Sequence, residues 1–204
     1  METVRGKARC GACASRGGLG EQVECLWRPR AAQIERKAVI MTPTPIVPGP
    51  GQESVWDYPR PAKAEPTAAH LSVIFAGQVI AETRRGVRTL ETSHPPTYYF
   101  PPDDVASERL QPGGHRSHCE WKGEARYFDL LVDGHRAANA AWTYPAPTPA
   151  FEILRGYIAF YPGLMEACLV DGERAQPQPG GFYGGWVTHH VTGPFKGGPG
   201  SRGW

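Results

Sequence analysis

The chain has 204 residues, 40% hydrophobic and 21% charged, which is enough for one domain with a modest core and additional tails. Eight Lys/Arg and four Glu fall in residues 1–40, whereas the remainder holds 14 basic and 16 acidic side chains. This near-neutral remainder disfavours nucleic-acid binding, which usually requires a basic face. No apolar run reaches the length of a transmembrane helix or a signal peptide, so we expect no membrane association.

The five cysteines fall into two groups, Cys10, Cys13 and Cys25 in the first 40 residues and Cys119 and Cys168 further along. An odd count spaced in this way does not resemble a disulfide framework, so we expect a reducing, cytoplasmic location. Cys10 and Cys13 form a lone C-x-x-C. Because zinc usually takes about four ligands from two such pairs, we expect no metal and no cofactor here.

Residues 1–52 are predicted to be an N-terminal extension outside the folded domain. Arg and Gly cluster in the first 40 residues with little apolar periodicity, apart from a possible short helix at residues 31–40. Met41 then opens the stretch MTPTPIVPGPG. We expect translation to begin at Met41, and the alternative is a genuine basic arm.

Residues 53–175 are predicted to form a β domain. Residues 70–84 alternate between apolar runs and a turn at Gly77–Gln78, which is typical of a hairpin. Residues 87–91 alternate as a half-buried strand does, and residues 97–100 form a short aromatic strand. A helical turn is expected at about residues 102–109, where proline and aspartate favour a helix start.

A second hairpin is predicted over residues 124–144, with its turn at Asp133–Gly134. Residues 148–155 are the best helix candidate, because Thr148 can cap it and Pro149 suits its first position. Strands follow at 157–161 and 166–170, with a turn at Asp171–Gly172. Seven or eight short strands, one or two short helices and no βαβ alternation predict a compact, mainly β, antiparallel fold with a minor helical part.

Residues 176–204 combine dense Gly and Pro with aromatic side chains. Such frequent glycine does not favour helix or strand, but aromatic rings tend to leave water. We therefore expect a tail that packs on the domain. The alternative is a tail that binds a partner.

The residues of greatest chemical interest gather in the stretch from 87 to 144. A lysine such as Lys122 favours the thiolate form of a nearby cysteine such as Cys119, so this pair could supply a nucleophile or redox thiol, with His118 or Glu91 as base. The alternative is a small buried hydrophobe beside a surface lysine. Glu91, His94, His118 and Cys119 could also ligate a metal, although a histidine in a His-Pro-Pro turn is the plainer account.

Aromatic residues in the same stretch could line a pocket for a small organic ligand: Tyr98, Tyr99, Trp121, Tyr127, Trp142 and Tyr144. We place the candidate ligand contacts at Tyr99, Tyr127, Trp142, Tyr144 and His118, with Lys122 meeting an anionic or carbonyl group. The alternative is that these rings simply complete the core of a small sheet.

Four pieces resemble domain-of-unknown-function family 427: ETSHPPTYYFPPDDV at 91–105, HCEWKG at 118–123, AAWTYP at 140–145 and GYIAFY at 156–161. The resemblance covers about residues 56–172. The family usually has Cys-Pro-Tyr-Lys-Gly where this chain has Cys119-Glu-Trp-Lys-Gly. The segments 53–61 and 180–186 resemble those of actinobacterial members.

The resemblance implies a β-tent fold like that of the Mss4-like group. Zinc in that group is bound by paired C-x-x-C motifs, which residues 53–175 lack, so it does not carry over. Some naming schemes label the family nucleotidyltransferase-like, but the sequence has no Gly-Ser followed by paired aspartates. Asp103 and Asp104 are better explained by a cap or turn. Our first hypothesis is therefore a small-ligand binder; the alternatives are a non-catalytic interaction module and a Cys119-dependent enzyme. The oligomeric state is left open.

Overall fold

The structure is a computed structural model that describes residues 43–204. The predictions about Met41, the helix at 31–40 and the Cys10–Cys13 pair lie outside the described residues. Within the described part, no helix is long and apolar enough to cross a membrane.

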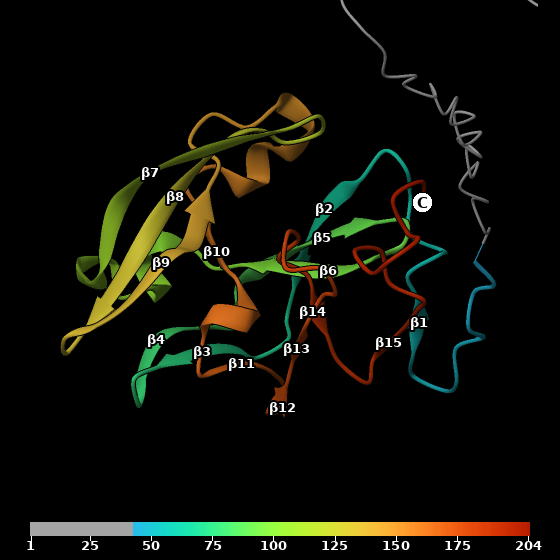
Figure 1. The fold of residues 1–204 in the computed structure, drawn as a ribbon, viewed down its shortest axis with the longest axis horizontal. Helices are drawn as coiled ribbons and strands as arrows, with labels where there is room; N and C mark the ends of the chain where they lie inside the picture. The colour runs from blue at the N-terminus through green and yellow to red at the C-terminus, as the bar shows by residue number, and fades with distance from the viewer. Residues whose placement is uncertain (1–42) are drawn as a thin grey trace, which may run out of the picture. The chain divides into compact units, whose positions relative to one another are not determined.

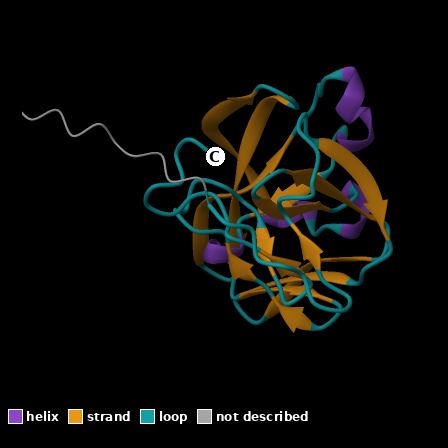
Figure 2. Ribbon diagram, turned by 90° about the vertical axis from the view of Figure 1, so that its right-hand side faces the viewer, coloured by secondary structure: helices purple, strands orange, loops and turns teal. Residues whose placement is uncertain are grey.

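The described chain is mainly β, as predicted, and its few helical segments are short 3-10 helices between strands (Figure 2). The strands are β1 (Glu53–Ser54), β2 (Lys63–Thr67), β3 (Leu71–Phe75), β4 (Gln78–Thr83), β5 (Gly86–Glu91), β6 (His94–Tyr99), β7 (Leu110–Cys119), β8 (Gly123–Val132), β9 (His135–Thr143), β10 (Ile158–Phe160), β11 (Ala167–Val170), β12 (Glu173–Arg174), β13 (Gln176–Pro177), β14 (Trp186–Val187) and β15 (Val191–Thr192). The 3-10 helices are η1 (Pro102–Asp104), η2 (Ser107–Arg109), η3 (Pro149–Leu154) and η4 (Pro162–Leu164).

Three antiparallel sheets carry the fold, in the orders β10-β9-β8-β7, β12-β11-β3-β4 and β2-β5-β6 (Figure 1). Phe100, just after β6, pairs with Ile158 of β10 and so connects two of them. Two short pairs complete the strand pairing: β13–β14 lies within the C-terminal segment, and the parallel β1–β15 joins the two ends of the described chain to each other. The β-tent relation implied by the resemblance stays a prediction.

Three hairpin turns follow directly from local sequence. Asp133–Gly134 joins β8 to β9 and Asp171–Gly172 joins β11 to β12, as predicted, and both residues of each turn have positive φ. The turn between β3 and β4 is Ala76–Gly77, one residue earlier than expected, again with both φ angles positive. This geometry matches the right-handed twist of the flanking strands.

The sequence prediction missed β2 and β7 and undercounted the strands, since ten strands in residues 43–204 have three residues or more. Each missed strand contains a proline, Pro66 in β2 and Pro112 in β7, and proline is not typical of a strand. Proline donates no ladder hydrogen bond, but β2 and β7 lie at sheet edges, where it is tolerated. A register shift between Pro112 and Arg116 further breaks the alternation.

The two predicted helical segments are found at the expected positions, but both form 3-10 helices. The turn expected at 102–109 is two separate 3-10 helices, η1 and η2, and Asp104 in η1 accepts hydrogen bonds from Thr83 Oγ1 and Arg85, each at 2.6 Å. Thr148 makes no side-chain cap to η3. Its hydroxyl donates instead to the Trp121 carbonyl at 2.5 Å, so the cap prediction is wrong.

The largest core cluster lies between the sheets and includes residues from the predicted tail. Trp186 is fully buried there, with its ring 5.3 Å from Tyr98 and its Nε1 donating to the Phe160 carbonyl at 3.1 Å. Residues 176–204 thus contribute a central aromatic side chain. The division at residue 175 stays a prediction, although the core itself continues beyond it.

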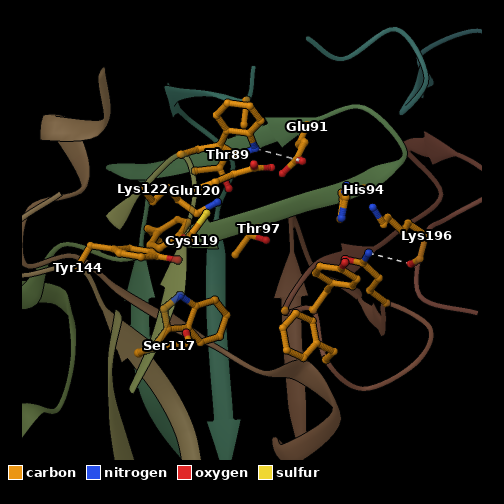
Figure 3. Close-up of a pocket in the computed structure, with 18 of the residues that line it drawn as sticks. Thr89, Glu91, His94, Thr97, Ser117, Cys119, Glu120, Lys122, Tyr144 and Lys196 are labelled. Carbon is orange, nitrogen blue, oxygen red and sulfur yellow. Dashed lines mark hydrogen bonds between the residues drawn. The ribbon is translucent and has the colours of Figure 1, made fainter. Parts of the chain in front are cut away.

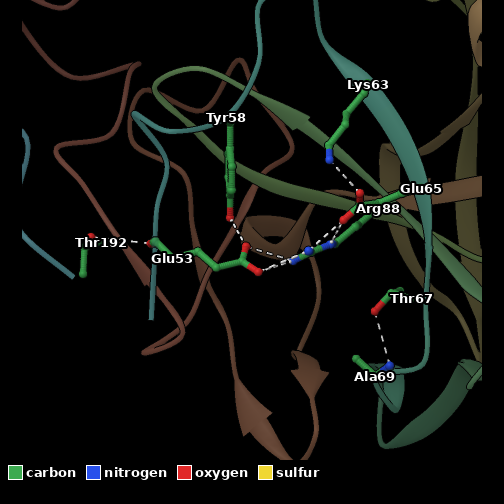
Figure 4. Close-up of polar contacts among 8 residues, drawn as sticks. All are labelled: Glu53, Tyr58, Lys63, Glu65, Thr67, Ala69, Arg88 and Thr192. Carbon is green, nitrogen blue, oxygen red and sulfur yellow. Dashed lines mark hydrogen bonds and ion pairs between the residues drawn. The ribbon is translucent and has the colours of Figure 1, made fainter. Parts of the chain in front are cut away.

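A polar network holds β1 against the β2-β5-β6 sheet (Figure 4). Arg88 of β5 pairs with Glu53 of β1 at 3.0 Å and with Glu65 of β2 at 2.7 Å, and the Tyr58 hydroxyl donates to Glu53 at 2.6 Å. Burial acts to raise the pKa of Glu53, but the hydrogen bonds from Tyr58 and Arg88 prevail and lower it. The pKa of Glu65 is lowered by hydrogen bonds from Lys63 and Arg88.

Candidate functional site

A cavity of ≈ 390 Å³ lies where the β5–β6 hairpin, the ends of β7–β9 and the C-terminal segment meet. All eight residues predicted for the site line it: Glu91, Tyr99, His118, Cys119, Lys122, Tyr127, Trp142 and Tyr144. Residues more than 50 positions apart in the sequence therefore line the same cavity.

The floor of the cavity follows from strand periodicity. Thr89 and Glu91 of β5 and Thr97 and Tyr99 of β6 are spaced by two, and Thr89 pairs with Thr97 across the ladder. Side chains spaced by two share one face of a sheet. The neighbouring Tyr98 points to the opposite face and packs on Trp186, so this member of the predicted aromatic set is a core residue.

An aromatic wall comes from the neighbouring sheet. Tyr127 of β8 and Trp142 of β9 are cross-strand partners, and the Trp142 ring lies 4.5 Å from Tyr161. Ser117 of β7 and the Tyr127 hydroxyl are 2.8 Å apart. The wall residues Tyr127 and Trp142 are buried and belong to a core cluster, so they both complete the core and line the cavity.

The C-terminal segment closes another side of the cavity, a contribution that sequence reasoning missed. Gln178, Phe182, Tyr183, Gly184 and Lys196 all line it. These residues follow or fall between glycines and prolines, so no periodic signal placed them. The only hint in the sequence was the unusual density of aromatic residues among those glycines.

Lys122 and Cys119 lie together at one end of the cavity (Figure 3). The backbone of Thr148 donates to the Lys122 carbonyl at 3.2 Å, and the Lys122 ammonium lies 5.7 Å from the centre of the Phe151 ring, within the range of a cation–π contact. The start of η3 thus holds the turn that carries Lys122.

The Lys122 ammonium is partly removed from water. Burial acts to lower its pKa, but Tyr99, Cys119 and Glu91 outweigh burial, and the net pKa is raised. Lys122 therefore stays charged at neutral pH. In residues 43–204 it forms no salt bridge with a carboxylate.

The other charged groups at the cavity already have partners or face solvent. Lys196 donates to the Trp204 oxygen at 2.6 Å, and Arg60 to the same oxygen at 3.5 Å. Glu91 accepts a hydrogen bond from the Trp121 indole at 3.3 Å, and Glu120 is exposed. Three cations and two carboxylates leave the lining with a formal charge of +1 when its histidines are neutral.

His94 is buried at the first position of β6, so the loop-histidine account is wrong. Burial lowers its pKa, which keeps the ring neutral at physiological pH. Its Nδ1 lies 3.0 Å from the Thr92 carbonyl, and because a carbonyl only accepts, Nδ1 carries the proton. Nε2 is then the free acceptor. The ring packs edge-on against Tyr183 at 4.7 Å.

The candidate base groups are not joined to the thiol. His118 is exposed at the rim, and no hydrogen bond among the described residues links it or Glu91 to Cys119. The side chain that interacts with Cys119 is that of Lys122. The four proposed metal ligands are likewise not grouped, since the one His/Cys/Asp/Glu cluster with metal-ligand spacing in residues 43–204 is elsewhere.

The family model described as "domain of unknown function (DUF427)" matches residues 63–171, more than half of the chain. The chain belongs to the DUF427 family. The match spans β2 to the turn after β11 and contains Cys119, Lys122 and the aromatic wall, but not the C-terminal segment that closes the cavity. A comparison with curated proteins finds no match.

Proposed function

We propose that this DUF427 protein binds a small organic ligand in the cavity, with an anionic or carbonyl group of the ligand at Lys122. The observation that carries the proposal is the charged ammonium of Lys122, which lines a concave cavity and has no carboxylate partner in residues 43–204. Burial alone would disfavour that charge, and Glu91 favours it without pairing with it directly. A ligand anion would pair with the ammonium and would also suit the net positive lining.

The body of the ligand would be planar or apolar. Trp142, Tyr161 and Tyr127 present ring faces and edges to the cavity, and concave sites lined by aromatic rings with few polar groups are typical of small-molecule binding. A second cavity of ≈ 450 Å³ shares Ser117, Tyr127, Tyr161, Gln178, Phe182 and Tyr183 with the first and adds Pro162 and Leu164. A longer ligand could extend its apolar end there.

The test is a thermal-shift screen of the full chain against aromatic and aliphatic carboxylates, phosphate esters and carbonyl compounds. A ligand at about 100 times its Kd stabilises by about 2.7 kcal/mol, which for a chain of this size raises the unfolding temperature by about 5–10 °C. Lys122→Met should abolish the shift. Lys63→Met is the matched control, because Lys63 lies outside the cavity and pairs with Glu65.

A hit that shifts the parent and Lys122→Met equally would refute the role of Lys122, and a screen without any hit would count against ligand binding. Tyr99→Phe tests the Lys122 end of the cavity separately from the aromatic wall. Its hydroxyl faces the Lys122 end of the cavity, so its loss should weaken binding without unfolding the protein.

A second candidate, a Cys119-dependent enzyme, rests on the interaction between Cys119 and Lys122. The Lys122 ammonium would stabilise the Cys119 thiolate, as a charged histidine does in a thiolate–imidazolium pair. Iodoacetamide at neutral pH should then label Cys119 much faster than Cys168, whose pKa burial raises. Loss of the fast label in Lys122→Met would support this role, and equal slow labelling of both cysteines would exclude it.

An interaction module is supported less well, because the residues that would form its free tail are packed in the fold. Trp186 is fully buried, so deletion of 176–204 would unfold the domain rather than expose a docking defect. Cys119 and Cys168 are free thiols, in keeping with a reducing compartment, and we propose that this is the cytoplasm.

A further inference from the structure

A group of two histidines and one glutamate lies outside the cavity, with the histidines on the turn between β14 and β15 and the glutamate in β12. His189, His190 and Glu173 each offer a ligand atom within 4.8 Å of the other two. None of the three lines either cavity. It is the only such group in residues 43–204.

The backbone explains why two adjacent histidines converge. Neighbouring side chains diverge on a strand, but His189 and His190 occupy a turn, and their ring centres lie 3.8 Å apart. The Val191 amide closes the turn on the Thr188 carbonyl at 3.2 Å.

Further contacts hold the turn in place on two sides. Gln52 Nε2 donates to the His189 carbonyl at 2.5 Å, and the Glu53 amide donates to the His190 carbonyl at 2.7 Å. On the opposite side, the His189 amide donates to Glu173 Oε1 at 2.7 Å. The carboxylate is therefore oriented, and its second oxygen, Oε2, faces His189 Nδ1. The three ligands are positioned by backbone contacts and not by one another alone.

We propose that His189, His190 and Glu173 bind a divalent transition-metal ion, zinc in the first instance. Two imidazoles and one carboxylate are a ligand set that zinc takes in proteins, with water completing the tetrahedron. The three groups are partly exposed, so the ion can enter from solvent. The ion would connect β12 to the β14–β15 turn. The strand that follows this turn, β15, pairs in parallel with β1, so the ion would stabilise the C-terminal segment on the domain.

The competing account is a plain histidine–glutamate ion pair, and the chain contains a matched example. His70 Nε2 lies 2.7 Å from Glu82 Oε1, and no third ligand accompanies them. His190→Gln is the decisive variant, because it leaves the His189–Glu173 pair intact and removes only the third ligand. Glu173→Gln tests the carboxylate, and His70→Gln is the control.

The experiment uses the full chain with Cys10→Ser, Cys13→Ser and Cys25→Ser, so that N-terminal thiols cannot supply the signal. After dialysis against chelator, zinc affinity is measured by competition with a chromophoric chelator. We expect the parent and His70→Gln to bind a single ion, and His190→Gln and Glu173→Gln to bind at least about tenfold more weakly. Cobalt in place of zinc should give ligand-field bands without thiolate charge-transfer absorption, which separates this site from Cys119.

The unfolding temperature provides a second readout. It should rise with zinc concentration in the parent and in His70→Gln, but not in His190→Gln. Equal zinc affinity in the parent and His190→Gln, no zinc binding by the parent, or a thiolate signature in the cobalt spectrum would each overturn the proposal. Ligand binding in the cavity is measured separately, so either proposal can fail without the other.

Discussion

Replacement of Gly184 by alanine tests whether the C-terminal segment is pressed against the aromatic wall. A Cβ at this position would lie 2.1 Å from Trp142 Cη2 and 2.9 Å from Cζ3. Carbon atoms pack best at about 3.5–4.0 Å, so the ring or the segment must move by roughly 1.5 Å. Trp142 is buried and its ring lies 4.5 Å from Tyr161, which leaves it little room.

We expect Gly184→Ala to lower the free energy of unfolding by about 2–3 kcal/mol, the upper part of the usual range for overpacking. Gly184 does not have a positive φ, so the cost is steric and not a backbone penalty. Gly163→Ala is the control, because its Cβ would meet Pro177 at 3.6 Å, an ordinary contact. It should be neutral or stabilise by up to about 1 kcal/mol.

The assay is urea unfolding followed by tryptophan fluorescence, with the slope compared between variants. Trp142→Phe provides an internal check, because a smaller ring lacks the atoms that clash. The cost of Gly184→Ala should therefore shrink in the Trp142→Phe background. If Gly184→Ala costs no more than about 0.5 kcal/mol, or costs the same in both backgrounds, the segment does not pack on Trp142.

Two further predictions concern stability. Trp186→Ala should lower the free energy of unfolding by about 3–5 kcal/mol, because this side chain is fully buried. Phe182→Ala is the control: its side chain is 73% exposed, so the free energy of unfolding should change by less than about 0.5 kcal/mol. Similar losses of stability for the two variants in the same urea assay would contradict the burial of Trp186. Arg88→Met should destabilise by about 1–2 kcal/mol at pH 7. Because the folded state lowers the pKa of Glu53 and Glu65 below 4.5, their stabilising contribution is complete above that pH and is lost as the pH falls through the folded pKa values. The difference between parent and Arg88→Met should therefore shrink as the pH falls below 4.5, and a difference that stays constant from pH 7 to about pH 3 would refute the pairing.

The sequence alone was informative wherever local chemistry decides the structure. Asp133–Gly134 and Asp171–Gly172 adopt the predicted turns because positive φ at two successive residues is a local requirement that few residue types meet. The clustering of Cys119, Lys122 and aromatic residues in one stretch also led to a set of side chains that line one cavity. Family membership rests on the same contiguous motifs.

Local sequence patterns did not predict features that depend on the position of a strand at a sheet edge or on contacts between residues distant in the chain. Proline is unfavourable inside a strand, yet β7 forms around Pro112 because an edge strand can spare the missing donor. Thr148 was read as a helix cap, but its hydroxyl contacts Trp121, 27 positions away, and so orients the turn that carries Lys122. The residue periodicity around Thr148 and around Trp121 does not indicate this contact.

The sequence by itself thus determined the mainly β class, the hairpin turns and the residue types of the candidate site, because these depend on neighbours within a few positions. Only the tertiary structure decided that Trp186 is a core residue, that Gly184 packs on Trp142, and that Glu173 meets His189 and His190. Each of these depends on contacts between segments that are separated in the chain. Burial and strand register, and not local propensity, select such contacts.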